Sequence, residues 1–320
     1  MGVEFPQGGL TIESLTNRRG QQTFQAKLTY SGPLGMPRSQ LQRIKFDITQ
    51  DEVVVDPVER RVVYHQYSDL PTRVPEVTCY SLAELFAEKT RALYEREGRA
   101  RDVYDVVNIG RNFRNIVPAE RAREILLEKF TFKEIPTPST ASILDRIDID
   151  TLSTDWENAL RHQLPVLPPV QEFFEALRES LDWWIEEARP EVELSGIPGA
   201  EKAERVPRVM FAGAPGLGSL GSGVGPLEWA QEAPAFSNAM ESIRFSARNR
   251  LLARVTYHGV ERLVEPYSLR RPSTGNLLLY VYEVRRGGIP SGGIKAFKVA
   301  EIESAAATDQ PFAAQYLVEL

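Results

Sequence analysis

The chain is poor in the residues that build disulfides and metal centres. It has one cysteine, Cys79, and three histidines in 320 residues. A single cysteine excludes an internal disulfide and a cysteine-rich zinc site, and it favours a reducing compartment, so we expect a cytoplasmic protein. The histidines His65, His162 and His258 are far apart in sequence, which argues against a histidine-based metal site or a Ser-His-Asp relay.

Long hydrophobic runs are also missing. No stretch approaches the roughly 18 uncharged apolar residues that a membrane helix needs, and residues 1–30 lack the basic-then-apolar order of a signal peptide. We therefore expect no membrane partner. The composition, 42% hydrophobic and 26% charged, is ordinary for a globular protein and excludes a disordered or collagen-like chain.

Negative charge is unevenly distributed along the chain. The net charge is −6, yet residues 241–320 hold 11 Lys and Arg against 8 Asp and Glu. The C-terminal part is therefore mildly basic behind an acidic body, which indicates an anionic partner for that part.

The pattern changes from strands to helices near residue 80. Runs rich in β-branched and aromatic residues predict strands at 24–30, 44–48, 53–55 and 61–67. Ser81 and Glu84 then have capping-box spacing, and the apolar residues that follow recur at helical spacing. Gly98 interrupts this helix, and a second begins near Arg101. Further helices are predicted at about 118–130, 155–163 and 170–188, so the fold class is α+β.

The second half divides into a linker and a small all-β unit. Residues 196–233 are rich in Gly and Pro and predict a linker between a first domain, 1–195, and a last domain, 234–320. Strands are predicted at 251–257, 277–284 and 294–299, with turns at Gly259, Gly275 and Gly287. Short strands of this kind are typical of a small β-barrel or sandwich.

One candidate ligand lies on the strand at 44–48. Strand alternation places Lys45 and Asp47 on the face opposite Ile44, Phe46 and Ile48. A carboxylate fixed on a strand can hold a divalent cation, which prefers hard oxygen ligands. An edge strand whose Lys/Asp face is exposed to solvent is the alternative interpretation of the same residues.

Lys89 stands out within the helix that begins at Ser81. It sits four residues from both Leu85 and Leu93, inside the apolar stripe. A lysine there must snorkel beside Glu88, find an acidic partner, or point into a cleft, where it could bind phosphate as a point charge.

The next helix carries two acidic residues on one face. Asp102 and Asp105 are three apart, and Arg101 can reach Asp105 at i+4. Paired carboxylates in a cleft could position a nucleotide or take a proton, and a surface ion-pair network is the alternative.

The order of these motifs resembles the AbiEii/AbiGii toxin family. Lys-Phe-Asp on a strand precedes Tyr80-Ser-Leu-Ala-Glu-Leu-Phe-Ala-Glu-Lys89, and Arg101-Asp-Val-Tyr-Asp105 follows. The resemblance runs from about residue 3 to residue 185. It implies a nucleotidyltransferase-like toxin of an abortive-infection, phage-defence toxin–antitoxin system, with a partial nucleotidyltransferase-like fold and a helical extension.

The resemblance assigns roles to these residues. Asp47 matches the metal-binding carboxylate of the family's second motif, with Lys45 beside it. Lys89 matches the lysine that contacts the nucleotide phosphates, and Arg101, Asp102 and Asp105 match the fourth motif. The implied chemistry is transfer of a nucleotidyl group from an NTP, assisted by Mg²⁺, to an RNA acceptor such as tRNA. A cognate antitoxin is an implied partner.

The family's first motif has no match here. That motif, Gly-Ser followed by Asp-x-Asp, supplies two metal-binding carboxylates, whereas this sequence has no Gly-Ser before residue 218 and no aspartate before Asp47. We therefore expect an N-terminally truncated toxin, a mis-assigned start or a degenerate homologue. Little or no transferase activity is expected from this polypeptide alone.

The tail has a resemblance of its own. Arg254-Val-Thr-Tyr-His-Gly, Leu277-Leu-Leu-Tyr and Phe297-Lys-Val-Ala-Glu-Ile look like a WYL-type domain, although the Trp-Tyr-Leu triplet itself is absent. The resemblance implies a small Sm/SH3-like β-barrel that binds nucleic acid or a small ligand. The basic residues that could meet phosphates are Arg254, Arg270, Arg271, Arg285 and Arg286. A solvated rim on a scaffolding barrel is the alternative.

Two functions follow from the sequence. The first is a nucleotidyltransferase toxin component, truncated or degenerate in this chain. The second is a catalytically inactive regulator that binds nucleic acid or an antitoxin and carries a WYL-like sensor.

Overall fold

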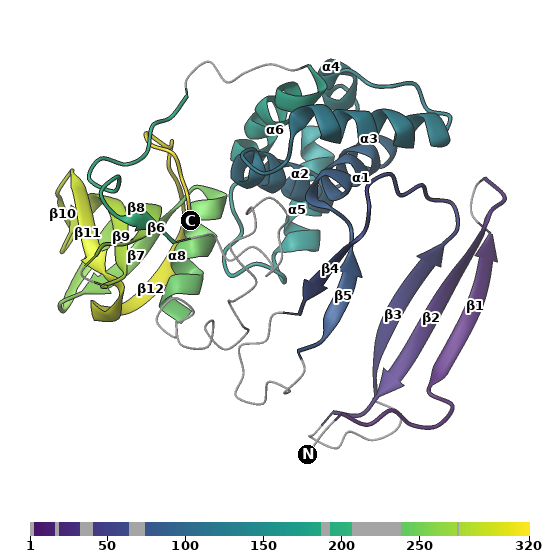
Figure 1. The fold of residues 1–320 in the computed structure, drawn as a ribbon, viewed down its shortest axis with the longest axis horizontal. Coiled ribbons are helices and arrows are strands. Elements are labelled where there is room, and N and C mark those ends of the chain that lie inside the picture. The colour runs from purple at the N-terminus through teal and green to yellow at the C-terminus, as the bar shows by residue number, and fades with distance from the viewer. Residues whose placement is uncertain are drawn as a thin grey trace. The chain divides into compact units, whose positions relative to one another are not determined.

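The computed structural model describes residues 3–16, 19–32, 41–63, 74–186, 193–206, 238–273 and 275–320. The chain forms two compact units, Met1–Val54 and Val55–Leu320, a boundary that the sequence did not indicate. Six helices follow one another over residues 82–185, and antiparallel strands dominate the segments before and after them, which agrees with the predicted α+β class (Figure 1).

The N-terminal unit is an antiparallel sheet of three strands. They are β1 (Leu10–Thr16), β2 (Gln22–Tyr30) and β3 (Gln42–Thr49), in the order β1-β2-β3. Ile44 lies opposite Leu28 and Phe46 opposite Ala26, so the predicted apolar face exists. Ile44, Phe46 and Ile48 are nevertheless 41–53% exposed. The edge-strand interpretation of β3 therefore holds within the described sheet.

The second unit begins with a short hairpin and a set of helices. The hairpin pairs β4 (Glu59–Val62) with β5 (Glu76–Cys79). The helices are α1 (Leu82–Glu95), α2 (Ala100–Phe113), α3 (Ala119–Phe132), α4 (Thr140–Leu144), α5 (Ile149–Leu160) and α6 (Val170–Ile185).

The helix predictions are confirmed more fully than the strand predictions. Every predicted helix exists, although the one expected at 155–163 already starts at Ile149. The strand expected at 53–55 is wrong, because this segment has no ladder partner. The strand expected at 61–67 starts at Glu59 and ends at Val62, and residues 64–67 lie outside the described part.

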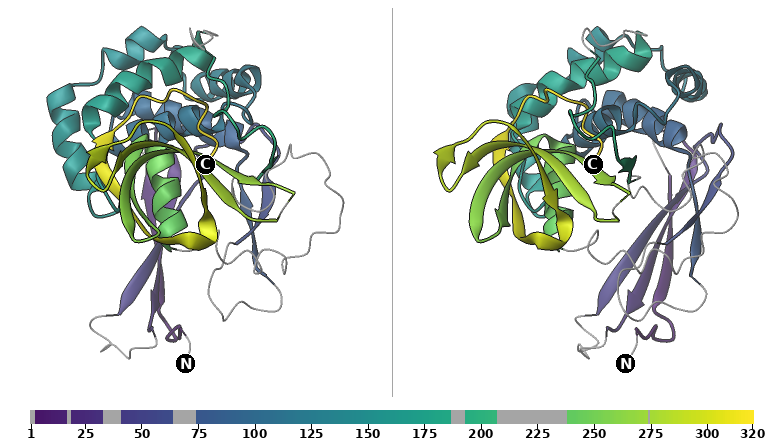
Figure 2. Two further views of the ribbon diagram at one scale, coloured as in Figure 1. Left: turned by 90° about the vertical axis from the view of Figure 1, so that its left-hand side faces the viewer. Right: turned by 60° about the vertical axis from the view of Figure 1, so that its left-hand side comes forward.

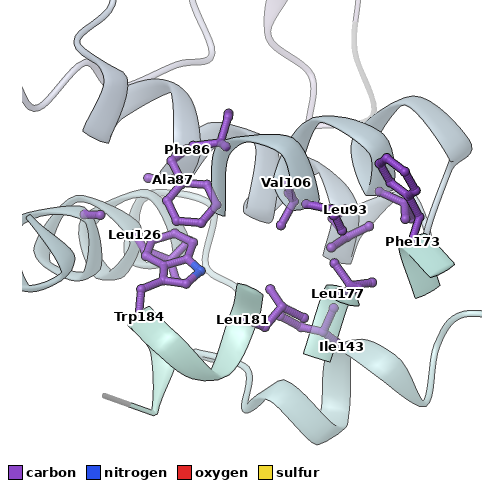
Figure 3. Close-up of a cluster of buried hydrophobic side chains, with 14 of the residues drawn as sticks. Phe86, Ala87, Leu93, Val106, Leu126, Ile143, Phe173, Leu177, Leu181 and Trp184 are labelled. Atoms are coloured by element: carbon purple, nitrogen blue, oxygen red, sulfur yellow. The ribbon is translucent and has the colours of Figure 1, made fainter. Parts of the chain in front are cut away.

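The start of α1 follows the predicted cap. The Ser81 hydroxyl accepts a hydrogen bond from the Glu84 amide at 3.0 Å, which satisfies an otherwise unpaired donor of the first turn. The apolar face of α1 then packs into the core of the helices, where Phe86 stacks on Trp184 with ring centroids 4.1 Å apart (Figure 3). The labelled side chains in this core come from helices α1, α2, α3, α4 and α6 and are buried.

The C-terminal part is a curled antiparallel sheet with one helix. It contains β6 (Glu204–Arg205), α8 (Asn238–Asn249), β7 (Leu251–Tyr257), β8 (Val260–Arg271), β9 (Leu278–Arg286), β10 (Ile289–Pro290), β11 (Ile294–Lys298), a 3₁₀ turn η3 (Val299–Glu301) and β12 (Ile302–Pro311). The order is β10-β9-β8-β7-β12, with β11 also on β9 and β6 on β8. Helix α8 lies in the hollow of this sheet (Figure 2) and was not predicted.

The sheet differs from the predicted barrel in its closure. Strands β7, β9 and β11 match the predictions within two residues. The pairings of the described strands form one path from β10 to β12 and do not join its two ends. Buried Met240 and Ile243 of α8 fill the concave side instead of a further strand.

The first part of the predicted linker belongs to the C-terminal core. Ile197 and Ala200 are buried in the same cluster as α8 and the curled sheet, and Arg205 pairs with Arg270 across β6 and β8. Residues 196–206 are therefore structured, and the rest of the predicted linker, 207–233, lies outside the described residues.

No helix in the described ranges is long and apolar enough to cross a membrane.

Candidate functional site

Lys89 and Asp105 form an ion pair between α1 and α2. The Lys89 ammonium lies 2.6 Å from Asp105 Oδ2, and both side chains are about one-third exposed, at 31% and 36%. Lys89 therefore leaves the apolar stripe of α1 to meet an acidic partner on the neighbouring helix. A lysine held in this way remains within reach of solvent and of an anionic ligand.

Asp102 lies one turn before Asp105 and is almost completely buried. Its carboxylate is 3.4 Å from Arg96, the C-cap residue of α1. Burial raises the pKa of Asp102 above its ordinary value, and the positive charges of Arg96 and Lys89 offset only part of this effect. The site therefore holds two carboxylates in different environments, one buried and one accessible.

Two local features set the position of α2 against α1. Gly98, with φ +81°, turns the chain between the helices, and a side chain there would collide with Ile147. The N-cap residue of α2, Arg99, makes no side-chain hydrogen bond to the first turn of the helix. Asp155 of α5 supplies it by accepting a hydrogen bond from the Ala100 amide at 2.8 Å.

Replacing Asp102 with asparagine is expected to stabilise the protein at neutral pH. The folded-state pKa of Asp102 is raised, so native Asp102 resists ionisation, and its contribution to stability falls as pH rises above the ordinary pKa. In urea unfolding, the free energy of unfolding of Asp102→Asn should exceed that of the wild type at neutral pH. The difference should be smaller near pH 4, close to the ordinary aspartate pKa of about 4. Exposed Asp145→Asn is the matched control. A loss of stability at neutral pH would show that the Arg96 pair outweighs desolvation.

Arg101 does not form the predicted ion pair with Asp105 within the described residues. It is exposed on the first turn of α2, and the partner of Asp105 is Lys89 rather than Arg101. The predicted i to i+4 pair is wrong, because the carboxylate of Asp105 turns towards α1. Sequence spacing alone did not indicate Arg96, six residues before its partner Asp102, or the cap from Asp155.

Asp47 and Lys45 lie in the N-terminal unit, on β3. Gln25 of β2 donates a hydrogen bond to Asp47 Oδ1 at 3.0 Å, and Lys45 lies opposite Lys27 in the register of the two strands. These residues share the polar face of the sheet, as the alternation predicted. Their role together with Lys89 stays a prediction.

The described ranges hold no group of three or more His, Cys, Asp or Glu side chains arranged to hold a metal ion. Asp47 is therefore one carboxylate with an amide neighbour. Mg²⁺ commonly binds through one or two carboxylates and completes its shell with substrate phosphates and water, so a single residue suits a metal that arrives with a nucleotide.

Two of the basic residues predicted on the C-terminal sheet have acidic partners, and a third, Arg271, is half-buried at the end of β8. Arg270 is paired with Glu319 and Ser268, and Arg254 lies 3.7 Å from Glu261. Arg285 and Arg286 are exposed at the end of β9, so they are the members of the set best placed to meet phosphates.

Comparison with known families finds one match. The family model for the nucleotidyl transferase AbiEii toxin of type IV toxin–antitoxin systems matches residues 3–187, which is more than half of the chain. No curated protein matches the chain significantly, and no solved structure does either. The matched range includes β1 to β3 and the helices that carry Lys89, Asp102 and Asp105.

Proposed function

Because this chain belongs to the AbiEii family of nucleotidyltransferase toxins from type IV toxin–antitoxin systems, we propose that the Lys89–Asp105 pair is the nucleotide-phosphate site of such an enzyme. The substrates are an NTP and an RNA acceptor such as tRNA. A cognate antitoxin is the expected protein partner, and defence by abortive infection is the expected role.

The geometry of Lys89 is the observation that carries this proposal. A lysine at this point of the α1 stripe would be expected to pack its stem inward, yet the Lys89 side chain is about one-third exposed and its ammonium is held by Asp105 on another helix. Asp105 fixes the direction of the ammonium, so less side-chain entropy is lost when a phosphate binds. The charge of Lys89 then offsets charge on the phosphates.

The other residues have supporting roles in this proposal. Arg101, exposed one turn before Asp105, is available to a second phosphate oxygen. Buried Asp102 anchors Arg96 and holds the junction between α1 and α2. Asp47 is the proposed ligand of Mg²⁺, and Lys45 beside it is a further candidate for nucleotide contact. When bound, Mg²⁺ would polarise the phosphates for transfer to a hydroxyl of the acceptor with release of pyrophosphate.

Removing the Lys89 ammonium is expected to weaken NTP binding at least tenfold. A charge-assisted hydrogen bond is worth about 1.5–3 kcal/mol, which corresponds to a tenfold change or more in Kd. The measurement is isothermal titration of the full chain with each NTP and Mg²⁺, using Lys89→Ala. Exposed Lys202→Ala is the matched control. Equal NTP affinity in wild type and Lys89→Ala would overturn the assignment of the phosphate site.

The second candidate function is an inactive regulator that binds nucleic acid through a WYL-like C-terminal domain. The exposed pair Arg285 and Arg286 favours it, because paired guanidinium groups bind phosphates well. The two functions are separated by titrating tRNA into the chain without NTP and by following transfer of labelled nucleotide to tRNA. Salt-sensitive tRNA binding without NTP binding or transfer would select the regulator.

A further inference from the structure

The three-stranded sheet of the N-terminal unit has one face that consists of apolar side chains. Directly opposite residues of β1, β2 and β3 share a face, and so do alternate residues along each strand. Three rows of the register therefore lie on one face: Leu10–Leu28–Ile44, Ile12–Ala26–Phe46 and Ser14–Phe24–Ile48. We name these residues the apolar sheet face. All of them except Ser14 are apolar, and none is charged.

The opposite face of the sheet is polar, and some of its charges already have partners across the strands. The Lys27 ammonium lies 3.0 Å from Glu13, and Gln25 donates a hydrogen bond to Asp47. The role proposed above for Asp47 and Lys45 belongs to this polar face. The apolar sheet face has no part in that role.

The apolar sheet face is exposed to solvent although its side chains are large. Ala26 is the sole fully buried hydrophobic residue among the described residues of Met1–Val54. A sheet of this size buries little apolar surface by itself, so it gains stability when a partner covers the face. The large side chains of the face that are 41–62% exposed are Leu10, Ile12, Ile44, Phe46 and Ile48.

The composition of this face indicates the kind of partner that would cover it. A nucleic acid needs positive charge on the protein, and the apolar sheet face carries none. Interfaces between different proteins commonly use charge to choose the partner, whereas homodimer interfaces are richer in apolar area. An uncharged apolar face therefore fits a second copy of itself better than it fits a charged partner.

The size of the face suits a weak dimer. Strand β1 has 7 residues, so three strands about 4.8 Å apart, with a rise of about 3.4 Å per residue, cover roughly 14 Å by 24 Å. Two such faces packed together bury on the order of 1,000 Å² of accessible surface, which is the lower limit of a specific interface. The association should therefore depend on protein concentration.

We propose that the apolar sheet face is a homodimer interface in which the sheets of two copies stack face to face. Stacked sheets lie about 10 Å apart, which allows the side chains of the two faces to interdigitate. Ala26 is small and lies between Ile12 and Phe46 in the central row. A large side chain of each copy can therefore pack above Ala26 of the other across a two-fold axis.

The test is sedimentation velocity of the full chain over a hundredfold range of protein concentration. A mass that rises with concentration from one chain towards two chains is the expected result, because two identical faces close at a dimer. A mass of one chain at every concentration would overturn the proposal and leave the face to a different partner. Growth beyond two chains would overturn it as well, because stacked faces leave no second face of the same kind.

Matched lysine substitutions show which face holds the two copies together. Ile12→Lys and Phe46→Lys each place a charge in the central row and should weaken dimerisation at least tenfold, because an unpaired charge is costly to bury. Leu15→Lys is the control, since Leu15 is also exposed on β1 but lies on the opposite face. Lys89→Ala should dimerise like the wild type. A dimer that persists in both face variants, or that Leu15→Lys weakens equally, contradicts the proposal.

A measurement on the wild type keeps the proposal testable if the face variants fail to fold. Amide hydrogen exchange is compared at low and high protein concentration, because dimerisation stabilises the unit that carries the interface. Protection of β1, β2 and β3 should rise with concentration, while protection of α1 to α6 should change little. Protection of the three strands that is equal at both concentrations would show that the apolar sheet face stays uncovered.

Discussion

Replacing Lys129 with methionine is expected to lower the free energy of unfolding by about 3–5 kcal/mol. The Lys129 ammonium is buried and lies 2.7 Å from Glu84 and 3.2 Å from Glu88. Glu84 has no exposed surface and also accepts hydrogen bonds from the amides of Val55 and Asp56. Removing Lys129 would leave this carboxylate charged and buried without its cation.

Urea unfolding followed by tryptophan fluorescence would measure this loss, because Trp156, Trp183 and Trp184 lie in or against the helical core. The double variant Lys129→Met with Glu84→Gln should recover much of it, since glutamine keeps an acceptor for the two amides and carries no charge. Exposed Lys295→Met is the matched control and should change stability little. If the double variant is as unstable as Lys129→Met, the loss in the free energy of unfolding comes from lost packing and not from the unpaired carboxylate.

Replacing Gly98 with alanine is expected to destabilise the protein by about 2–4 kcal/mol, from a left-handed backbone and an overpacked core. Gly98 has φ +81°, where a Cβ atom is disfavoured. That Cβ would lie 2.5 Å from Cγ1 and 2.8 Å from Cγ2 of Ile147, which is a core residue. The junction that positions Lys89 against Asp105 would have to shift, so NTP binding should weaken together with stability.

A double-mutant cycle with Ile147→Ala separates the two causes. If the collision dominates, Gly98→Ala costs less in the Ile147→Ala background than in the wild type. Gly259→Ala is a control for the backbone alone, because Gly259 has φ +69° and no atom within 4 Å of an added Cβ. Additive effects in the cycle would place the whole cost in the backbone conformation.

The helices could be predicted because their signals are local. The Ser81 cap, the apolar spacing of α1 and the break at Gly98 each lie within a few residues, and the structure confirms them. Strand β8 and helix α8 were missed. Strand β8 contains Pro266, and a proline within a run of residues argues against a strand. Helix α8 is rich in polar residues, and its packing against the sheet stabilises it.

The candidate site was predictable only in part. The two acidic residues of α2 and the lysine within the apolar stripe of α1 could be identified from spacing, and they lie within the residues that the family model matches. The ion pair between Lys89 and Asp105 could not be identified from the sequence. Asp105 could pair with Arg101 on its own helix or with Lys89 on the preceding helix. The choice between them depends on how α1 and α2 pack.

The sequence by itself determined the fold class, the succession of helices and the family, since these depend on periodicity, caps and motif order along the chain. The tertiary structure alone decided which charges meet. It buried Lys129 with Glu84 and raised the pKa of Asp102. Desolvation and ion pairing depend on distances between helices that no local pattern encodes, and this is why the chemistry of the site required the structure.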